Sequence, residues 1–221
     1  RTIVTSQRLG ARLIRIGLSP RIAELTRREA QAYWRSRHAQ LFSRVPDLVS
    51  YVQNHAILNR DGEPLLGAFR FDIFSEVEFA SADALAVSVS SAYYQDVVLT
   101  DEACLLDASN RAFLMTERRG DGSTGLRNGA IKLVQFRTAT EGEPSDADPI
   151  GTGGASAWSD RVTQVAGWPG IQPAVLHQFP FASVEAAMDA RSLLTDDAVI
   201  ASVIVEQIVI VRPVQPRIYH S

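Results

Sequence analysis

The sequence is poor in the features that mark several specialised classes of protein. It has a single cysteine, Cys104, so it can form neither an internal disulfide nor a metal site built from several cysteines. Its 22 basic and 25 acidic residues nearly balance, so no strong positive field is available for a nucleic acid or an anionic membrane. No apolar run approaches the length that crosses a bilayer. We therefore expect no nucleic-acid partner, no membrane association and a cytoplasmic location.

The composition is that of a folded globular protein. Hydrophobic residues make up 46% of the 221 residues and charged residues 21%, a balance that argues against intrinsic disorder. The chain is long enough for one large domain or two small ones, with a buried core in either case.

Three segments of the first half recur, in the same order, in the second half. The matches are WRSRHAQL (from Trp34) with WSDRVTQV (from Trp158), FASADAL (from Phe79) with FASVEAA (from Phe181), and LTDEACLL (from Leu99) with LTDDAVIA (from Leu194). Three collinear matches favour an internal duplication over chance. In the first match His38 stands opposite Val162, so the second copy has no titratable ring at that position.

The first copy predicts a regular succession of strands and helices. ARLIRIGL is typical of a strand, and Thr26 with Glu29 forms the capping box that begins a helix. Three- and four-residue spacing places Trp34 and His38 on the apolar face of that helix. LVSYVQNHAIL and GAFRFDIFSEVEF predict two strands, a second helix begins near Ser81, and NRAFLMTER predicts a closing strand. The order β-α-β-β-α-β is that of the ferredoxin-like unit.

The second copy opens on the predicted strand AIKLVQFR, and by analogy with the first copy a helix from Trp158 is expected to follow. The stretch between Trp168 and Phe181 is too short for the full hairpin of the first copy, so the middle strands are expected to be shortened or one to be missing. We predict an α+β fold of two ferredoxin-like units, residues 11–119 and 130–213. They are expected to pack sheet to sheet as a barrel within one chain, with a cavity between the sheets.

The first copy resembles the EthD family of the dimeric α+β barrel superfamily. The resemblance rests on LTRREAQAYWRSRHAQLFSRVPDLVSYVQNHAI, FDIFSEVEFASADAL, DEACLLD and AFLMTER, and covers roughly residues 11–119. The second half resembles the same unit only weakly. The resemblance implies a small-molecule substrate and no cofactor. It also implies that tandem members form the barrel within one chain, so that two chains can associate further as a homodimer.

The resemblance also implies a range of activities. Related barrels catalyse dehydration, cyclisation or isomerisation of polyketide-like aromatics and lactones, and others oxygenate phenols without a cofactor. We therefore expect a cofactor-independent lyase or isomerase, of dehydratase or cyclase type, that acts on a small oxygenated, ring-bearing substrate through a histidine. The alternatives are a cofactor-free monooxygenase of phenolic compounds and a non-catalytic small-molecule-binding or accessory protein.

Carried over position by position, the family's histidines fall on His38 and His55, and its strand carboxylate falls on Glu76. An imidazole titrates near neutral pH, so either ring can accept and donate a proton. A carboxylate beside such a ring can fix its tautomer, which is the role expected of Glu76. The plainer alternatives are a core histidine at position 38, a polar strand residue near an edge at 55 and an exposed strand end at 76.

The remaining site predictions come from strand alternation. Tyr51, Gln53 and His55 share one face of their strand. Because the other face carries Val52 and Ala56, we expect the first set to face the cavity. The expected substrate-binding residues are Tyr33, Trp34, Tyr51, Gln53, Asn54 and Phe74. No close pairs of metal ligands occur along the chain, so no metal site is expected.

Overall fold

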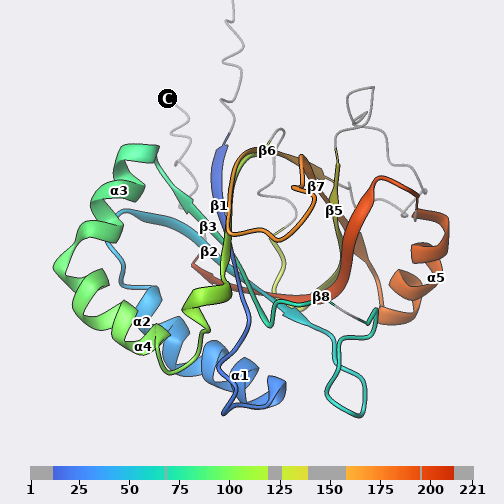
Figure 1. Ribbon diagram of the computed structural model, residues 1–221, viewed down its shortest axis with the longest axis horizontal. Coiled ribbons are helices and arrows are strands. Elements are labelled where there is room, and N and C mark those ends of the chain that lie inside the picture. Colours follow the sequence, from blue (N-terminus) through green and yellow to red (C-terminus); the bar gives the residue numbers. More distant parts are fainter. Residues whose placement is uncertain (1–11, 68, 119–125, 139–157, 195, 212–221) are drawn as a thin grey trace, which may run out of the picture.

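The computed structural model describes residues 12–67, 69–118, 126–138, 158–194 and 196–211 (Figure 1). The strands are β1 (Arg12–Ser19), β2 (Leu48–Ala56), β3 (Ile73–Phe79), β4 (Ala112–Arg118), β5 (Ala130–Arg137), β6 (Trp158–Ala166), β7 (Val175–Phe181) and β8 (Val199–Val211). They form a closed barrel in the order β1-β3-β2-β8-β5-β7-β6-β4. Every neighbouring pair is antiparallel.

The barrel consists of two half-sheets with the same internal order, β4-β1-β3-β2 and β8-β5-β7-β6. They join where β2 pairs with β8 and where β4 pairs with β6. Closure leaves neither half-sheet with an unpaired edge. The predicted α+β fold, two related units forming a barrel within one chain, is confirmed.

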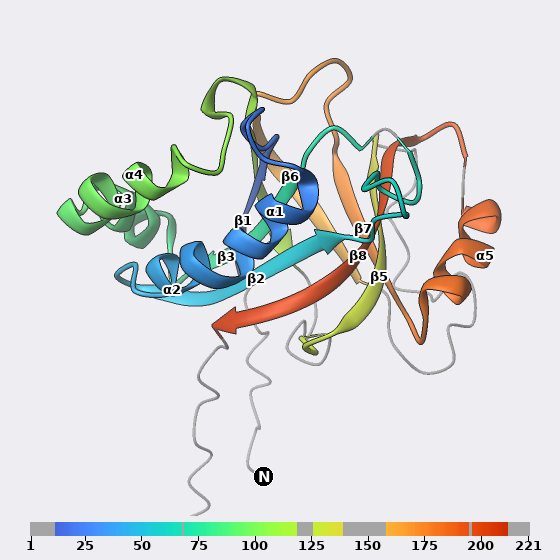
Figure 2. The same cartoon turned by 90° about the horizontal axis from the view of Figure 1, so that it is seen from below.

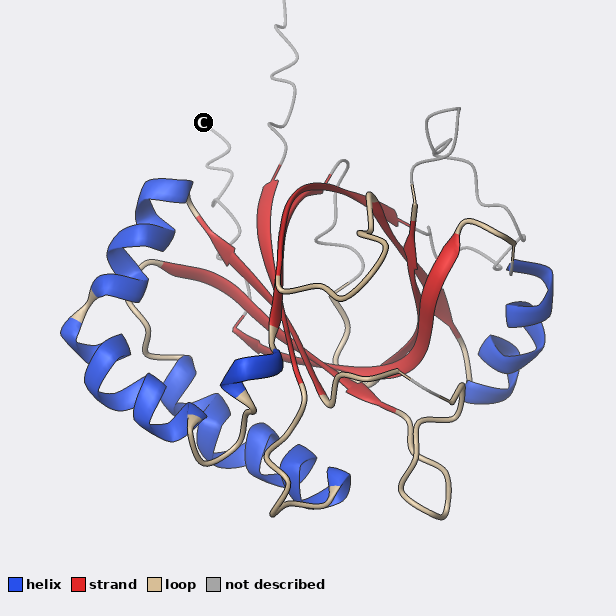
Figure 3. Cartoon of the chain, in the orientation of Figure 1, coloured by secondary structure: helices blue, strands red, loops and turns tan. Residues whose placement is uncertain are grey.

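Helices cover the outer faces of the two half-sheets (Figures 2 and 3). Those of the first half are α1 (Arg27–Tyr33), the π-helical η1 (Trp34–His38), α2 (Ala39–Phe42), α3 (Ala82–Ser90), the π-helical η2 (Tyr94–Val98) and α4 (Leu99–Glu102), followed by the 3-10 turn η3 (Ala108–Asn110). The second half contributes α5 (Val184–Leu194). None of the helices in the described ranges is long and apolar enough to span a membrane.

The predicted start of the first helix is correct. Thr26 adopts an extended conformation, its Oγ1 accepts a hydrogen bond from the backbone N–H of Glu29 at 3.3 Å, and the Glu29 carboxylate accepts one from the Thr26 N–H at 2.8 Å. The helix then continues through η1 into α2. This continuity carries Trp34 and His38 to the face that packs on the sheet, where both are buried.

The prediction for the second copy needs two corrections. The segment from Trp158 is strand β6, not a helix, and β6 and β7 form the complete middle hairpin that was expected to be shortened. In the register, Trp158 lies opposite Gln178 as Val52 lies opposite Glu76, so Trp158 corresponds to Val52 and not to Trp34. A short match in Trp, Arg and Gln does not fix the backbone period, because each of these residues is accepted in a strand when packing favours it. Residues 139–157, before β6, lie outside the described residues.

The space between the half-sheets was expected to be a cavity but is occupied by an apolar core and by buried ion pairs. Ile16, Leu114, Val134 and Val203 are among its fully buried members. Separate apolar clusters lie outside the barrel, between each half-sheet and its helices. The layer between sheet and helices in the first half is the one that holds the candidate site.

Candidate active site

His38 lies on the buried, sheet-facing side of the first helical segment. Its ring contacts a carboxylate of α4, in the second helical segment. Its Nδ1 lies 2.8 Å from Oδ2 of Asp101, on α4, and both side chains are at most 5% exposed. A carboxylate accepts hydrogen bonds, so this contact places the imidazole hydrogen on Nδ1. Nε2 is then an acceptor, and no residue that the structure describes donates to it.

Asp101 is the centre of a small polar cluster. Its Oδ1 accepts hydrogen bonds from the Tyr33 hydroxyl at 2.6 Å and from Arg37 Nε at 3.1 Å. Burial favours the neutral acid, but the bonds from His38, Tyr33 and Arg37 outweigh it and hold the pKa of Asp101 below its usual value. Burial and the neighbouring carboxylate raise the pKa of Tyr33 to about 12. Asp101 is therefore ionised and Tyr33 protonated at neutral pH, which fixes the orientation of the His38 ring.

His38 lines a cavity between the first half-sheet and its helices. The cavity is enclosed by Arg15, Gly17, Leu18, Ser19, Trp34, His38, Phe42, Tyr51, Ile73, Ser75, Glu102, Leu106, Arg111 and Phe113. Asp101 is not among these residues, so the edge of His38 that can meet a ligand is the one carrying Nε2. Gly17 leaves room for the Ser75 side chain, because a Cβ at position 17 would lie 2.6 Å from Ser75 Oγ and would force that hydroxyl to move.

Tyr51 lines the same cavity and has a hydroxyl group that can still donate a hydrogen bond. Its hydroxyl oxygen accepts hydrogen bonds from Trp34 Nε1 at 3.0 Å and from Gln53 Nε2 at 2.9 Å. Both lone pairs are thereby used, and the hydroxyl hydrogen has no acceptor among the residues that the structure describes. Burial raises the pKa of Tyr51 despite these two bonds, so the phenol stays neutral and able to donate.

His55 supports Tyr51 and does not line the cavity. Its Nε2 lies 2.8 Å from Gln53 Oε1, its ring stacks on Trp34 with centroids 4.5 Å apart, and it is 2% exposed. Because the Gln53 amide donates to Tyr51 through Nε2, its oxygen faces His55, and His55 must carry its hydrogen on Nε2. Burial, with a smaller effect of Arg35, lowers the pKa of His55 to about 3, so the ring is neutral.

The predicted orientation of β2 is therefore wrong. Tyr51, Gln53 and His55 face the helices, whereas Val52 and Asn54 point into the barrel. The error has a physical cause: β2 is buried on both faces over most of its length, so polarity does not distinguish them. Inside the barrel the small apolar residues complete the core, and Asn54 has a buried partner in Glu76 at 2.8 Å.

A known protein family resembles this half of the molecule. Residues 23–109 match the family model of the EthD domain. This part of the chain is similar to an EthD domain. The matched residues run from the start of the first helix to the turn before β4 and include both His38 and Asp101. The predicted family resemblance is confirmed for this part of the chain.

Solved structures resemble the whole barrel. A crystal structure of an anthrone oxidase-like protein superposes with a TM-score of 0.57 at 9% identity, covering 93% of this chain and 95% of that one. A candidate chlorite dismutase superposes with a TM-score of 0.50 at 9% identity, covering 89% and 95%. Identities this low show a shared fold alone. Among curated proteins, no sequence matches this chain.

The first half of the barrel does not bring all of the predicted site residues together. Trp34 and Tyr51 line the cavity with His38, Tyr33 binds Asp101, and Gln53 holds Tyr51. Asn54, Phe74 and Glu76 instead lie inside the barrel. Glu76 is therefore not the carboxylate that orients His38, because Glu76 points into the barrel and His38 lies on the outer side of the sheet, beside Asp101.

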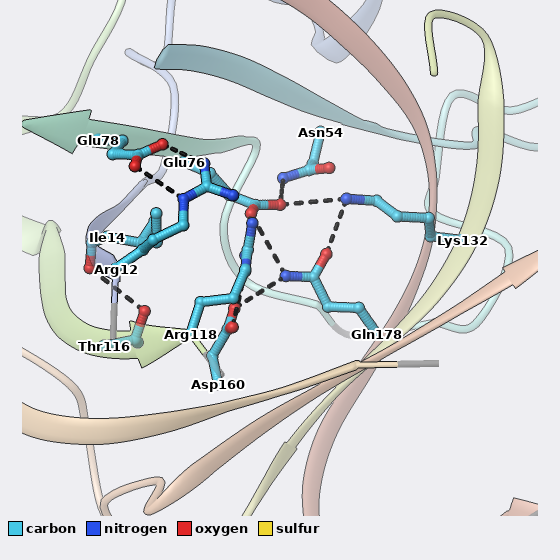
Figure 4. Close-up of polar contacts among 10 residues, drawn as sticks. All are labelled: Arg12, Ile14, Asn54, Glu76, Glu78, Thr116, Arg118, Lys132, Asp160 and Gln178. Atoms are coloured by element: carbon cyan, nitrogen blue, oxygen red, sulfur yellow. Dashed lines mark hydrogen bonds and ion pairs between the residues drawn. The ribbon is translucent and has the colours of Figure 1, made fainter. Parts of the chain in front are cut away.

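Glu76 belongs to a buried ionic network in the barrel (Figure 4). Its carboxylate pairs with Arg118 at 2.5 Å and with Lys132 at 3.1 Å. Arg118 also pairs with Asp160 at 2.6 Å, and Gln178 bridges Lys132 and Asp160 at 2.7 and 3.2 Å. Burial alone raises the pKa of Glu76, but the charges of Lys132 and Arg118 lower it below its usual value. Two cations and two anions thus offset one another in the interior.

Asp101, Glu102, Arg15 and Arg111 were not among the residues predicted from the sequence. Asp101 lies in LTDEACLL, one of the repeated segments, and the aspartate recurs in LTDDAVIA. Asp101 and Glu102 are adjacent carboxylates on a helix that was expected to cover the same sheet as the helix of His38. This pattern could have suggested that one of them lies near His38. The partnership itself was not readable, because 63 positions separate the two residues.

Proposed function

We propose that the EthD-like half is a cofactor-independent lyase or isomerase in which His38 is the general base. The observation that supports it best is the pairing of Nδ1 of His38, a residue that lines the cavity, with the ionised Asp101. A carboxylate in this position orients the imidazole and stabilises the imidazolium that forms when Nε2 takes a proton.

The reaction begins next to a carbonyl group of the substrate. His38 Nε2 takes the proton from the adjacent carbon, and the electrons of that C–H bond form the C=C bond of an enolate, with negative charge on the carbonyl oxygen. In a dehydration, the electrons return to expel a β-hydroxyl group, which takes the proton from the imidazolium and leaves as water. In an isomerisation, the imidazolium returns the proton to a different carbon.

Tyr51 is suited to stabilise the enolate. Its hydroxyl oxygen is occupied by two donors, so the O–H is free to donate to an oxygen in the cavity. A fixed donor of this kind stabilises developing charge without having to reorient. Trp34, Gln53 and His55 act as positioning residues for it.

Substrate entry requires side chains to move. The cavity has a volume of about 40 Å³, enough for a few water molecules, whereas small-molecule sites usually enclose roughly 300–1,000 Å³. Both helices above it contain a π-helical stretch, and such irregular turns are frequent at functional sites. We infer that a small oxygenated ring enters as the aromatic walls move apart.

The test is proton exchange. Cyclic β-hydroxyketones and unsaturated lactones are incubated with the protein in D2O, and NMR follows deuterium uptake next to the carbonyl and product formation. We expect His38→Gln to lower the rate by ~10²–10⁴-fold and Tyr51→Phe by ~10²-fold. His177→Gln, on β7 outside the cavity, is the matched control and should leave the rate unchanged.

Three outcomes contradict the proposal. A His38→Gln variant that folds normally and keeps full activity favours a binding or accessory protein. A wild-type protein that exchanges no member of the panel argues against enolate chemistry. Dioxygen uptake with a phenolic substrate assigns an oxygenase in place of a lyase or isomerase.

A further inference from the structure

The outer end of the cavity is cationic. Arg15, on β1, and Arg111, just before β4, both line it and are partly exposed, whereas His38 and Tyr51 are buried. The guanidinium carbon of Arg15 lies 4.1 Å from the centroid of the Phe113 ring, and that of Arg111 lies 5.5 Å from it. The cavity thus has two ends of different chemistry, with proton-transfer groups inside and positive charge at the entrance.

The two arginines differ in their partners. Arg111 Nη1 lies 3.1 Å from Oε2 of Glu102, so its charge is balanced by a neighbour. Arg15 forms no ion pair with any carboxylate in the part of the chain that the structure describes. A cation that has lost part of its hydration and gained no carboxylate is incompletely compensated.

The geometry leaves Arg15 able to bind an anion. Stacking on Phe113 uses the face of the guanidinium, and one N–H group interacts with the Tyr94 hydroxyl, which leaves the other N–H edges available. Those edges present two parallel donors, a spacing that matches the two oxygens of a carboxylate. The ring of a bound ligand can pack against the aromatic side chains that line the cavity.

We propose that Arg15, with Arg111 beside it, binds a carboxylate group of the substrate, so that the natural substrate is a ring-bearing carboxylic acid. This inference rests on the proposed function for the statement that the ligand is a substrate. The acid group is held at the entrance and the reacting carbonyl lies near Tyr51 and His38. Arg15 is thereby a specificity-determining residue.

Binding of two simple probes tests the inference without turnover. Benzoate and its uncharged isostere benzamide are titrated into the full-length protein, and NMR shifts and Trp fluorescence report the dissociation constants. We expect the wild type to bind benzoate at least tenfold more tightly than benzamide. Arg15→Met, which keeps an apolar cover over Phe113, should abolish that preference, and added salt should weaken it in the wild type.

His38→Gln separates this inference from the proposed function. We expect it to retain the preference for benzoate, because the base is not part of the anion subsite. A wild type that binds neither probe, or both equally, overturns the inference, as does a folded Arg15→Met variant that still prefers benzoate. If His38→Gln keeps full catalytic rate while Arg15→Met loses the preference, the proposed function fails and the subsite stands.

Discussion

The two halves of the barrel share a sheet but differ in what covers it. In the first half, two helical segments lie over the sheet (Figure 2). The cavity lined by His38 lies between them and the sheet. In the described part of the second half, α5 is the helix that packs on the sheet, and Ile57 and Leu66, from the segment between β2 and β3, pack beside it on Leu133. Barrel closure requires both half-sheets, because either alone exposes unpaired edges. The covering layer is not needed for closure, so it is free to diverge.

The two joins between the half-sheets differ in the charge of their paired residues. Glu76, Arg118 and Asp160 occupy positions in the register that correspond to Gln178, Gln207 and Asn54. At the join of β4 with β6 the paired residues, Arg118 and Asp160, are charged. At the join of β2 with β8 they are the amides Asn54 and Gln207. One seam of the barrel is ionic and the other is neutral.

The largest expected effect separates these two seams. Arg118→Met leaves Glu76 and Asp160 without their shared cation in the interior, and should lower the free energy of unfolding by about 3–5 kcal/mol. Gln207→Met, at the corresponding position, removes a neutral amide that donates to Arg127 O at 2.9 Å, and should cost about 1–2 kcal/mol. Urea unfolding measures both. Equal losses would show that the ionic seam has no special role.

The next comparison concerns the covering layers. Phe79 and Phe181 end corresponding strands, but Phe79 is 5% exposed beneath the helices of the first half and Phe181 is only partly buried. Phe79→Ala should cost about 3–5 kcal/mol, and Phe181→Ala about half of that, because less apolar contact is lost. Thermal and urea unfolding of both variants report the difference. A larger loss at Phe181 would mean that the second half has the tighter outer layer.

Acid should weaken the ionic seam specifically. The pKa of Glu76 is lowered in the folded protein, so the stability it contributes is present above its unfolded pKa of about 4.5 and is lost as the pH falls further. One such carboxylate contributes a slope of at most about 1.4 kcal/mol per pH unit. Glu76→Gln should flatten the fall of unfolding free energy below pH ~4.5. An unchanged slope would place the acid sensitivity elsewhere.

The smallest effect should be equal in the two halves. Ser81 and Ser183 precede α3 and α5, and their hydroxyls accept from the N–H groups of Ala84 at 3.1 Å and Ala186 at 3.2 Å. Loss of either cap by substitution with alanine should cost about 1 kcal/mol. Chemical denaturation of the two variants measures it. If the two losses of unfolding free energy differ by more than about 1 kcal/mol, these two helix starts are not equivalent.

The repeats in the sequence located the duplication but not all of its correspondences. The match of FASADAL with FASVEAA has the same offset as the register that relates Glu76 to Gln178. LTDEACLL begins with α4, and LTDDAVIA begins at Leu194, the last residue of α5. In the match of Trp34 with Trp158, the first segment is helical and the second is a strand. The exchange of His38 for Val162 is therefore not the loss of a catalytic ring from a second copy, because the two positions are not structural equivalents.

The sequence by itself determined the local features of this protein. Thr26 and Glu29 are three residues apart and cap their helix without help from the rest of the fold, and helical spacing alone turned Trp34 and His38 to the apolar face. The tertiary structure alone decided which face of β2 meets the helices and which carboxylate meets His38. Those outcomes depend on side chains far apart in the chain, which compete for buried partners only once the barrel has closed.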